Sequence, residues 1–177
     1  MTGGLSVQHC SQLQHLTMEQ INLGEHRLVL PDSIMHIGLM LVTPTGGLSV
    51  HHCSQLQHLS LDRVDIGAHE LTLPDNITHI QISNVTWTGG LSVYHCSQLQ
   101  HLELARLDLG EHGLVLPDNI TYIKLWDVAM TGGLSVQHCS HLKQLKMTRV
   151  DLDGHELVLP DNLTHIDLNN VTMAAGI

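Results

Sequence analysis

The chain has 177 residues, of which 42% are apolar and only 2% aromatic, with no Phe. Seven Lys and Arg against 17 Asp and Glu give a formal charge of −10. This acidity argues against nucleic acid or an anionic membrane as the main partner, because both need clustered positive charge. A basic or neutral protein surface is the expected partner. The first residues show no signal-peptide pattern, and the apolar run at 37–42 is too short to span a bilayer.

The sequence is a tandem repeat. The segment Thr-Gly-Gly-Leu-Ser-Val begins at Thr2, Thr45, Thr88 and Thr131, so the period is 43 residues. Four units span 2–44, 45–87, 88–130 and 131–173, and residues 174–177 resemble the start of a truncated fifth unit. We expect residues 1–177 to form a single solenoid domain, because short repeats bury their apolar faces against their neighbours.

Each unit divides into two similar halves, which predict eight rungs of 21 or 22 residues. Residues 56–64 follow the pattern L-x-x-L-x-L-x-x-V, and residues 77–85 repeat it. Alternation of apolar residues predicts strands. The shorter stretches at 71–73 and 91–93 predict a second, less regular sheet. The expected fold is mainly β, a right-handed parallel β-solenoid with little or no helix.

Glycine and proline mark the expected turns between these strands. They are Gly67, the pair Gly89-Gly90, and the Pro-Asp pairs that begin at Pro31, Pro74, Pro117 and Pro160.

The L-x-x-L-x-L pattern resembles the leucine-rich repeat over essentially the whole chain. Residues 159–168 look like its short-rung type, and residues 53–59 look like the cysteine-containing type of intracellular receptors. The chain departs from the family at one column, where the family usually has Asn. This column holds Ile21, Val42, Val64, Val85, Leu107, Val128, Val150 and Val171. The resemblance implies a curved solenoid whose strand face binds other macromolecules, as in immune receptors of the cytoplasm.

Four columns of the repeat differ in every unit. They are Thr17/Ser60/Glu103/Lys146, Glu19/Asp62/Ala105/Thr148, Gly38/Gln81/Lys124/Asp167 and Met40/Ser83/Trp126/Asn169. Because side chains alternate along a strand, all four columns are expected on the outward face of one sheet. The serine column of the opposite sheet, Ser6, Ser49, Ser92 and Ser135, does not vary. Variation on one face favours a recognition surface; a strand face that simply tolerates substitution is the alternative.

The candidate ligand-binding residues are these four columns together with Tyr122 and Asp127. Trp126, beside Lys124, is the best single anchor, because aromatic residues dominate the binding energy of interfaces. Met40 and Leu41 form a second, apolar candidate.

A column of histidines is expected on the same outward face. It runs His15, His36, His58, His79, His101, Tyr122, Gln144 and His165. Neighbouring rungs lie about 4.8 Å apart, so five imidazoles are expected to stack and to resist protonation. A metal site is the less favoured alternative, because no carboxylate recurs at ligand spacing. A second set, His26, His69, His112 and His155, is expected to bond backbone carbonyls in turns.

The four cysteines, Cys10, Cys53, Cys96 and Cys139, recur once per unit. Equivalent units lie two rungs apart, about 9.6 Å, which is too far for a disulfide. We expect a buried column of free thiols, which favours a reducing, cytoplasmic location. Five Asn-x-Thr sequons, at Asn76, Asn84, Asn119, Asn162 and Asn170, would matter only in a secreted protein; we interpret them as turn residues.

No catalytic residues, metal or cofactor are expected. His95 and Cys96 are adjacent, and strand alternation predicts that they point to opposite faces and form no nucleophile–base pair. The favoured function is a protein-binding recognition module, the ligand-sensing region of a larger receptor. The alternative is a structural repeat that stacks end to end, because neither end has the polar capping repeat that solenoids need.

Overall fold

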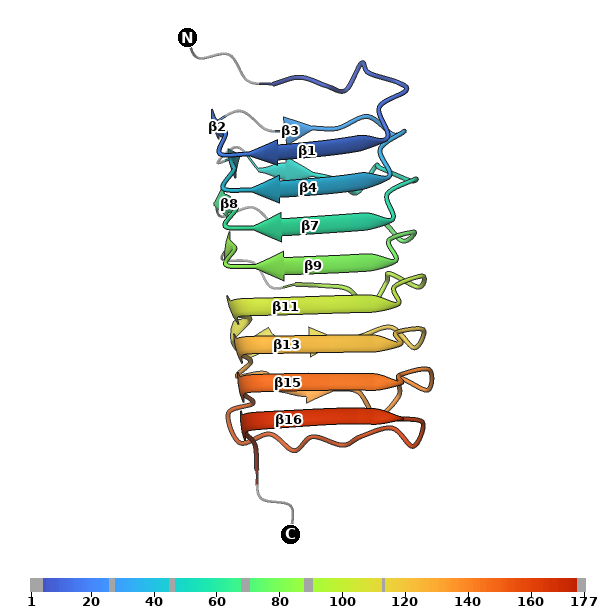
Figure 1. Cartoon of the computed structure of the whole chain (residues 1–177), viewed down its shortest axis with the longest axis vertical. Helices are drawn as coiled ribbons and strands as arrows, with labels where there is room; N and C mark the ends of the chain where they lie inside the picture. The colour runs from blue at the N-terminus through green and yellow to red at the C-terminus, as the bar shows by residue number, and fades with distance from the viewer. Residues whose placement is uncertain are drawn as a thin grey trace.

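The computed structural model describes residues 5–25, 28–44, 47–67, 71–87, 91–112 and 114–174. The Gly89-Gly90 turn, His26, His69 and most of the expected fifth unit lie outside these residues, as does the side chain of His112. Within them the fold is a parallel β-solenoid, shown in Figure 1 as a stack of strands with one strand per rung.

One eight-stranded parallel sheet organises the molecule. Its strands follow chain order: β1 (His15–Glu19), β4 (His36–Met40), β7 (His58–Asp62), β9 (His79–Ser83), β11 (His101–Asp108), β13 (Tyr122–Ala129), β15 (Gln144–Asp151) and β16 (His165–Thr172). Every neighbouring pair is parallel, and the same repeat positions face each other throughout. The predicted rungs and their order are confirmed.

The rest of each rung forms short pairings. Along one side, β2 (Asn22–Gly24) pairs with β5 (Thr43–Pro44), and β8 (Asp65–Gly67) pairs with β10 (Thr86–Trp87). Opposite the large sheet, β3 (Leu28–Val29) pairs with β6 (Leu48–Ser49), and β12 (Leu114–Val115) pairs with β14 (Leu134–Ser135). The helical content of the described residues is one short 3-10 turn, η1 (Gly110–His112). Within the described residues the second sheet is therefore present only in fragments.

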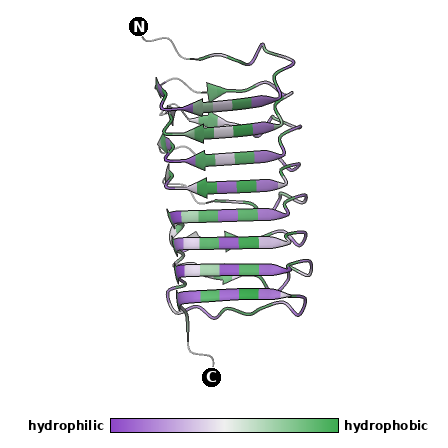
Figure 2. Ribbon diagram, in the orientation of Figure 1, coloured by the Kyte–Doolittle hydropathy of each residue, from purple (hydrophilic) through white to green (hydrophobic). Residues whose placement is uncertain are grey.

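The core lies between the large sheet and these short pairings. In β7, Leu59 and Leu61 are buried, whereas His58, Ser60 and Asp62 are half-buried on the other face. Figure 2 shows this alternation as bands of apolar and polar residues that line up from strand to strand. The column where leucine-rich repeats usually carry Asn is apolar here; Val42 and Val64 pack inward at 0% and 1% exposure, whereas Ile21 in the first rung is 38% exposed.

A left-handed residue at the end of each strand makes the corner between the large sheet and the adjoining side. These residues are Gln20, Leu41, Arg63, Asn84, Arg106, Asp127, Arg149 and Asn170, with φ between 51° and 58°. The corner turns the chain so that the next residue, such as Val64 after Arg63 or Val42 after Leu41, points into the core. The side chain of the corner residue itself remains at the rim of the outward face.

The remaining turns largely follow expectation. Each Pro-Asp pair enters a turn, as at Pro74, whose carbonyl accepts the N–H of Ile77. Three sequon asparagines, Asn76, Asn119 and Asn162, donate side-chain hydrogen bonds to the serine carbonyls of the preceding rung. These amides tie successive rungs together at the turns, which agrees with their interpretation as turn residues.

Candidate functional site

The four variable columns of the repeat merge into two continuous rows on the outward face of the large sheet. In the first row, Gln81 faces Glu103 and Glu103 faces Lys124. In the second row, Ser83 faces Ala105 and Ala105 faces Trp126. The structure therefore brings residues from different units side by side, so that each rung adds a different pair of side chains to one surface.

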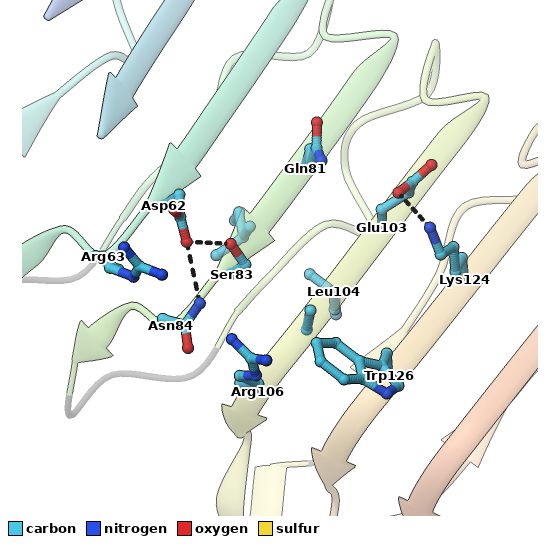
Figure 3. Close-up of a pocket in the computed structure, with 12 residues that line it drawn as sticks. Asp62, Arg63, Gln81, Ser83, Asn84, Glu103, Leu104, Arg106, Lys124 and Trp126 are labelled. Carbon is cyan, nitrogen blue, oxygen red and sulfur yellow. Dashed lines mark hydrogen bonds and ion pairs between the residues drawn. The ribbon is translucent and has the colours of Figure 1, made fainter. Parts of the chain in front are cut away.

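A hollow of about 480 Å³ lies on this face at rungs three to six (Figure 3). Its lining combines Asp62, Gln81, Ser83, Glu103, Ala105, Lys124 and Trp126 from the predicted site with Arg63, Ile82, Asn84, Leu104 and Arg106. Small side chains at Ser83 and Ala105 leave space between Asp62 on one side and Trp126 on the other. The hollow thus depends on which residue each unit carries in the variable columns.

The carboxylate of Asp62 is held by donors on the neighbouring rung. Its Oδ1 accepts hydrogen bonds from Ser83 Oγ at 2.6 Å and from Asn84 Nδ2 at 3.0 Å. The Ser83 bond lowers the pKa of Asp62 most strongly; the Asn84 bond and the charges of Arg63 and Arg106 act in the same direction, against the effect of burial. Asp62 is therefore a fixed, ionised wall of the hollow.

Trp126 forms the opposite wall and lies between two guanidinium groups. The Arg106 guanidinium carbon is 4.3 Å from the Trp126 ring centroid, and that of Arg149 is 5.1 Å away. Cation–π attraction of this kind orients both partners. Beside them, Lys124 Nζ lies 3.3 Å from Glu103 Oε2, an exposed pair that contributes little to stability.

The corner arginines are the site residues that sequence reasoning missed. Arg63 and Arg106 line the hollow, and Arg149 lies one unit further along. Their common signal is the repeated Arg-Val-Asp or Arg-Leu-Asp at 63–65, 106–108 and 149–151. Variation between units does not reveal these positions, because Arg63, Arg106 and Arg149 are the same in units two, three and four.

Other predicted site residues lie on the same face but outside the hollow. They are Thr17, Glu19, Gly38 and Met40 towards β1, Ser60 in β7, and Lys146, Thr148, Asp167 and Asn169 towards β16. Tyr122 belongs to the histidine column, and Asp127 pairs with Arg149, Oδ1 to Nε, at 3.9 Å. Met40 and Leu41 are 37% and 36% exposed.

The histidine column stacks as expected. Ring centroids are 4.3 to 4.5 Å apart from His15 through His101, and Tyr122 continues the stack at 5.6 Å. Partial burial, and then the neighbouring imidazoles, lower the pKa values of His36 and His79. The Nδ1 atom of His36 is buried without a hydrogen-bond partner among the described residues. His36 and His79 therefore favour the neutral form.

The prediction that His95 and Cys96 point apart was wrong. His95 Nε2 lies 3.6 Å from Cys96 Sγ, and the equivalent pairs His52–Cys53 and His138–Cys139 lie at 3.8 and 3.7 Å. The pair lies in a turn, where the N–H of Cys96 bonds to the carbonyl of Val93, so the alternation of a strand does not apply.

The contact between His95 and Cys96 is part of the structure of the turn and does not activate the Cys96 thiol. His95 Nε2 lies 2.9 Å from the carbonyl oxygen of Leu73, which can only accept, so the imidazole donates its proton there and has no lone pair for the thiol at that atom. Burial, then the charge of Asp75, raises the pKa of Cys96 to about 12. All four cysteines are free; Cys53, Cys96 and Cys139 are buried and Cys10 is partly buried, as expected for unpaired thiols.

Two sets of histidines in the turns bond to backbone carbonyls. His155 Nε2 bonds to the carbonyl of Thr131 at 2.9 Å, which fits the expectation for that set. The set that includes His52, His95 and His138 bonds the carbonyls of Leu30, Leu73 and Leu116, a ladder that sequence reasoning did not predict.

In the described part of the chain, no group of three or more His, Cys, Asp or Glu side chains is arranged to hold a metal ion. No helix there has the length and apolarity needed to cross a membrane.

Compared with family models, with curated proteins and with solved structures, the chain shows no match.

Proposed function

We propose that the outward face of the large sheet is a recognition surface for a protein partner, and that its centre is the hollow between Asp62 and Trp126. One observation carries this proposal: the columns that differ in every unit supply seven of the residues that line the hollow. Binding energy in protein interfaces concentrates in desolvated aromatic and arginine anchors, which Trp126 and Arg106 supply here.

Exposure alone does not account for the variation. The serine column on the other side of the solenoid does not vary, although it is exposed at Ser6 and Ser135, half-buried at Ser92 and buried at Ser49. In contrast, Asp62, Ser83 and Ala105 are only half-buried on the strand face and differ between units. The columns that differ in all four units lie on the strand face alone, which favours selection for binding.

The chain further serves as the ligand-sensing region of a larger, cytoplasmic receptor of the leucine-rich-repeat class, of the kind used in innate immunity. The repeat pattern and the free, buried thiols support this assignment. Its activity is binding, without catalysis, cofactor or metal, and without nucleic acid or membrane as partner.

Two baits with the same framework test the recognition surface. One bait is the native chain. In the other, Ser60, Asp62, Gln81 and Ser83 of the second unit are copied into the equivalent positions of all units. We expect a partner from a lysate to bind the native bait at least about tenfold more tightly, since loss of a central anchor costs 2 kcal/mol or more. Equal capture by both baits would refute the proposal.

End-to-end stacking is a second candidate, and the last rung favours it. Ile166 and Leu168 of β16 are 49% and 41% exposed, whereas their partners Leu145 and Met147 in β15 are fully buried. β16 also presents an open strand edge, which is a template for pairing with another chain. This candidate predicts that sedimentation mass rises with concentration and that Leu168→Lys abolishes the rise. A mass that is independent of concentration would exclude it.

A further inference from the structure

The positive charges of this acidic protein gather on one face. Of its seven Lys and Arg, Arg27 lies outside the described residues. Lys124 and Lys146 point outward from the large sheet, and Arg63, Arg106 and Arg149 stand at its corner. The remaining cation, Lys143, directly precedes β15. Among the residues that line the hollow, three cations, Arg63, Arg106 and Lys124, stand against two acids, Asp62 and Glu103, although the whole chain has a formal charge of −10.

The acids within the hollow are already engaged. Asp62 accepts hydrogen bonds from Ser83 and Asn84, and Glu103 pairs with Lys124. Among the described residues, Arg63 and Arg106 form no ion pair, although both help to hold Asp62 ionised from a distance. Both guanidinium groups therefore retain hydrogen-bond donors for a ligand.

Contact with Trp126 leaves the donors of Arg106 accessible. A guanidinium that stacks on a ring has its N–H groups in its own plane, directed past the ring edge, where they can bond both oxygens of a carboxylate. Figure 3 shows Asn84 between Arg63 and Arg106, with Trp126 beside Arg106. The arrangement is prepared for an anion that bridges the two corners.

The corner backbone strengthens this interpretation. Arg63, Arg106 and Arg149 have φ near 52°, where Asn and Asp are better tolerated than Arg. In the alternate rungs the same corner holds Asn84, Asp127 and Asn170. Strained residues persist where the surrounding structure or a function holds them, and here three of them point at one surface.

We infer that the hollow binds an extended acidic peptide segment whose carboxylates bridge Arg63 and Arg106. This inference rests on the proposed recognition function and adds the chemistry of the partner. Arg63 and Arg106 are two rungs apart, roughly 9.6 Å, and an extended chain advances about 3.3 Å per residue. Acidic residues three positions apart therefore match the spacing of the arginines, with the intervening residues over Ser83 and Asn84.

A polypeptide fits this face better than a nucleic acid. Asp62, Glu103 and Asp127 stand between the cations, and a backbone with a phosphate at every step would be repelled at each of them. A peptide can place its charges at the arginines and neutral residues elsewhere.

The test uses a labelled nonapeptide with Glu at positions one, four and seven among Gly, Ser and Thr. Three probes serve for comparison. They are a peptide of the same composition with its three Glu consecutive, a peptide with Lys in place of each Glu, and a single-stranded oligonucleotide with the same number of charges. Fluorescence anisotropy with the native chain is expected to show the tightest binding for the spaced Glu peptide, weakening as salt rises.

Arg63→Asn and Arg106→Asn remove the proposed contacts without harm to the corner, because Asn84 and Asn170 occupy the equivalent position. Each is expected to weaken binding about tenfold, the usual effect of losing a charge-assisted hydrogen bond. Lys143→Gln is the matched control: it removes one charge outside the hollow, and the other units carry Gln14, Gln57 and Gln100 there. It is expected to change binding less than twofold, within the range of an exposed charge.

Three results would overturn the inference. They are equal binding by the Arg63→Asn, Arg106→Asn and Lys143→Gln variants, equal binding of the spaced and consecutive Glu peptides, and tighter binding of the oligonucleotide or the Lys peptide. If the two-bait experiment still separates the native from the uniform face, the recognition function stands and only the acidic partner is excluded.

Discussion

The imidazole of His36 stacks on that of His58, with ring centroids 4.5 Å apart and planes inclined by 13°. His58 also stacks on His79 at 4.3 Å, so it adjoins both histidines whose pKa values are lowered. A proton on any ring of this column lies close to the next ring. The stack therefore links the stability of the fold to pH.

Acidification is expected to destabilise the protein through this column. Because folding lowers the pKa of His36 and of His79, the unfolded chain binds more protons as pH falls below about 7. The free energy of unfolding should fall from about pH 7 towards pH 5, on the acid side of the range in which the raised pKa values of Cys53, Cys96 and Cys139 affect stability. His58→Gln, which copies Gln144 of the same column, should flatten this fall; His165→Gln at the exposed end should not. Urea titrations at several pH values measure all three, and superimposed profiles for native and His58→Gln protein would contradict the explanation.

Leu41→Asn is expected to stabilise the protein. Leu41 has φ 53° and is 36% exposed, while Asn84 and Asn170 occupy the same corner elsewhere. Relief of the left-handed strain should raise the free energy of unfolding by about 1 kcal/mol. Val42→Asn, one residue later at 0% exposure, should lower it by more than about 2 kcal/mol because it buries an amide. Equilibrium denaturation measures the free energy of unfolding of both variants. A loss of stability in Leu41→Asn would contradict the interpretation that the corner is strained.

The thiols are expected to react unequally. Burial, followed by the charges of Asp32, Asp75 and Asp118, raises the pKa values of Cys53, Cys96 and Cys139 to about 11, 12 and 11. At pH 8 these thiols carry almost no thiolate and are shielded from solvent. Iodoacetamide should modify Cys10 first in the native protein and all four cysteines in urea. Mass spectrometry of peptides gives the order, and early labelling of Cys96 would be inconsistent with it.

Equivalent core substitutions should become less costly at the last rung. Leu145 and Ile166 face each other in β15 and β16, at 0% and 49% exposure. Leu145→Ala should lower the free energy of unfolding by about 2–5 kcal/mol, and Ile166→Ala by about 1 kcal/mol. Denaturant midpoints for the two variants provide the comparison. Equal losses would indicate that the last rung is covered in solution, as end-to-end stacking requires.

The strands and the rows of the site were predictable because a two-residue alternation determines which side chains share a face. Because Leu59 and Leu61 alternate with polar residues in a strand, both must face the core, and the variable columns between them must face outward. The corner was not predictable, because Arg63, Leu41 and Gln20 carry no preference for left-handed backbone. The contact between His95 and Cys96 was missed because alternation was applied to a turn. The hollow itself arises from small residues at Ser83 and Ala105, which no pattern in the sequence identifies.

The strand order of the large sheet also determines how the molecule responds to mechanical force. β1 and β16 are at opposite ends of the sheet, and every strand pairs only with the rung before it and the rung after it. Tension applied between these two strands acts along the interstrand hydrogen bonds and loads the rungs in series. The rungs would then detach one at a time, each releasing a similar length of chain, and the protein would lengthen in nearly uniform steps at low force.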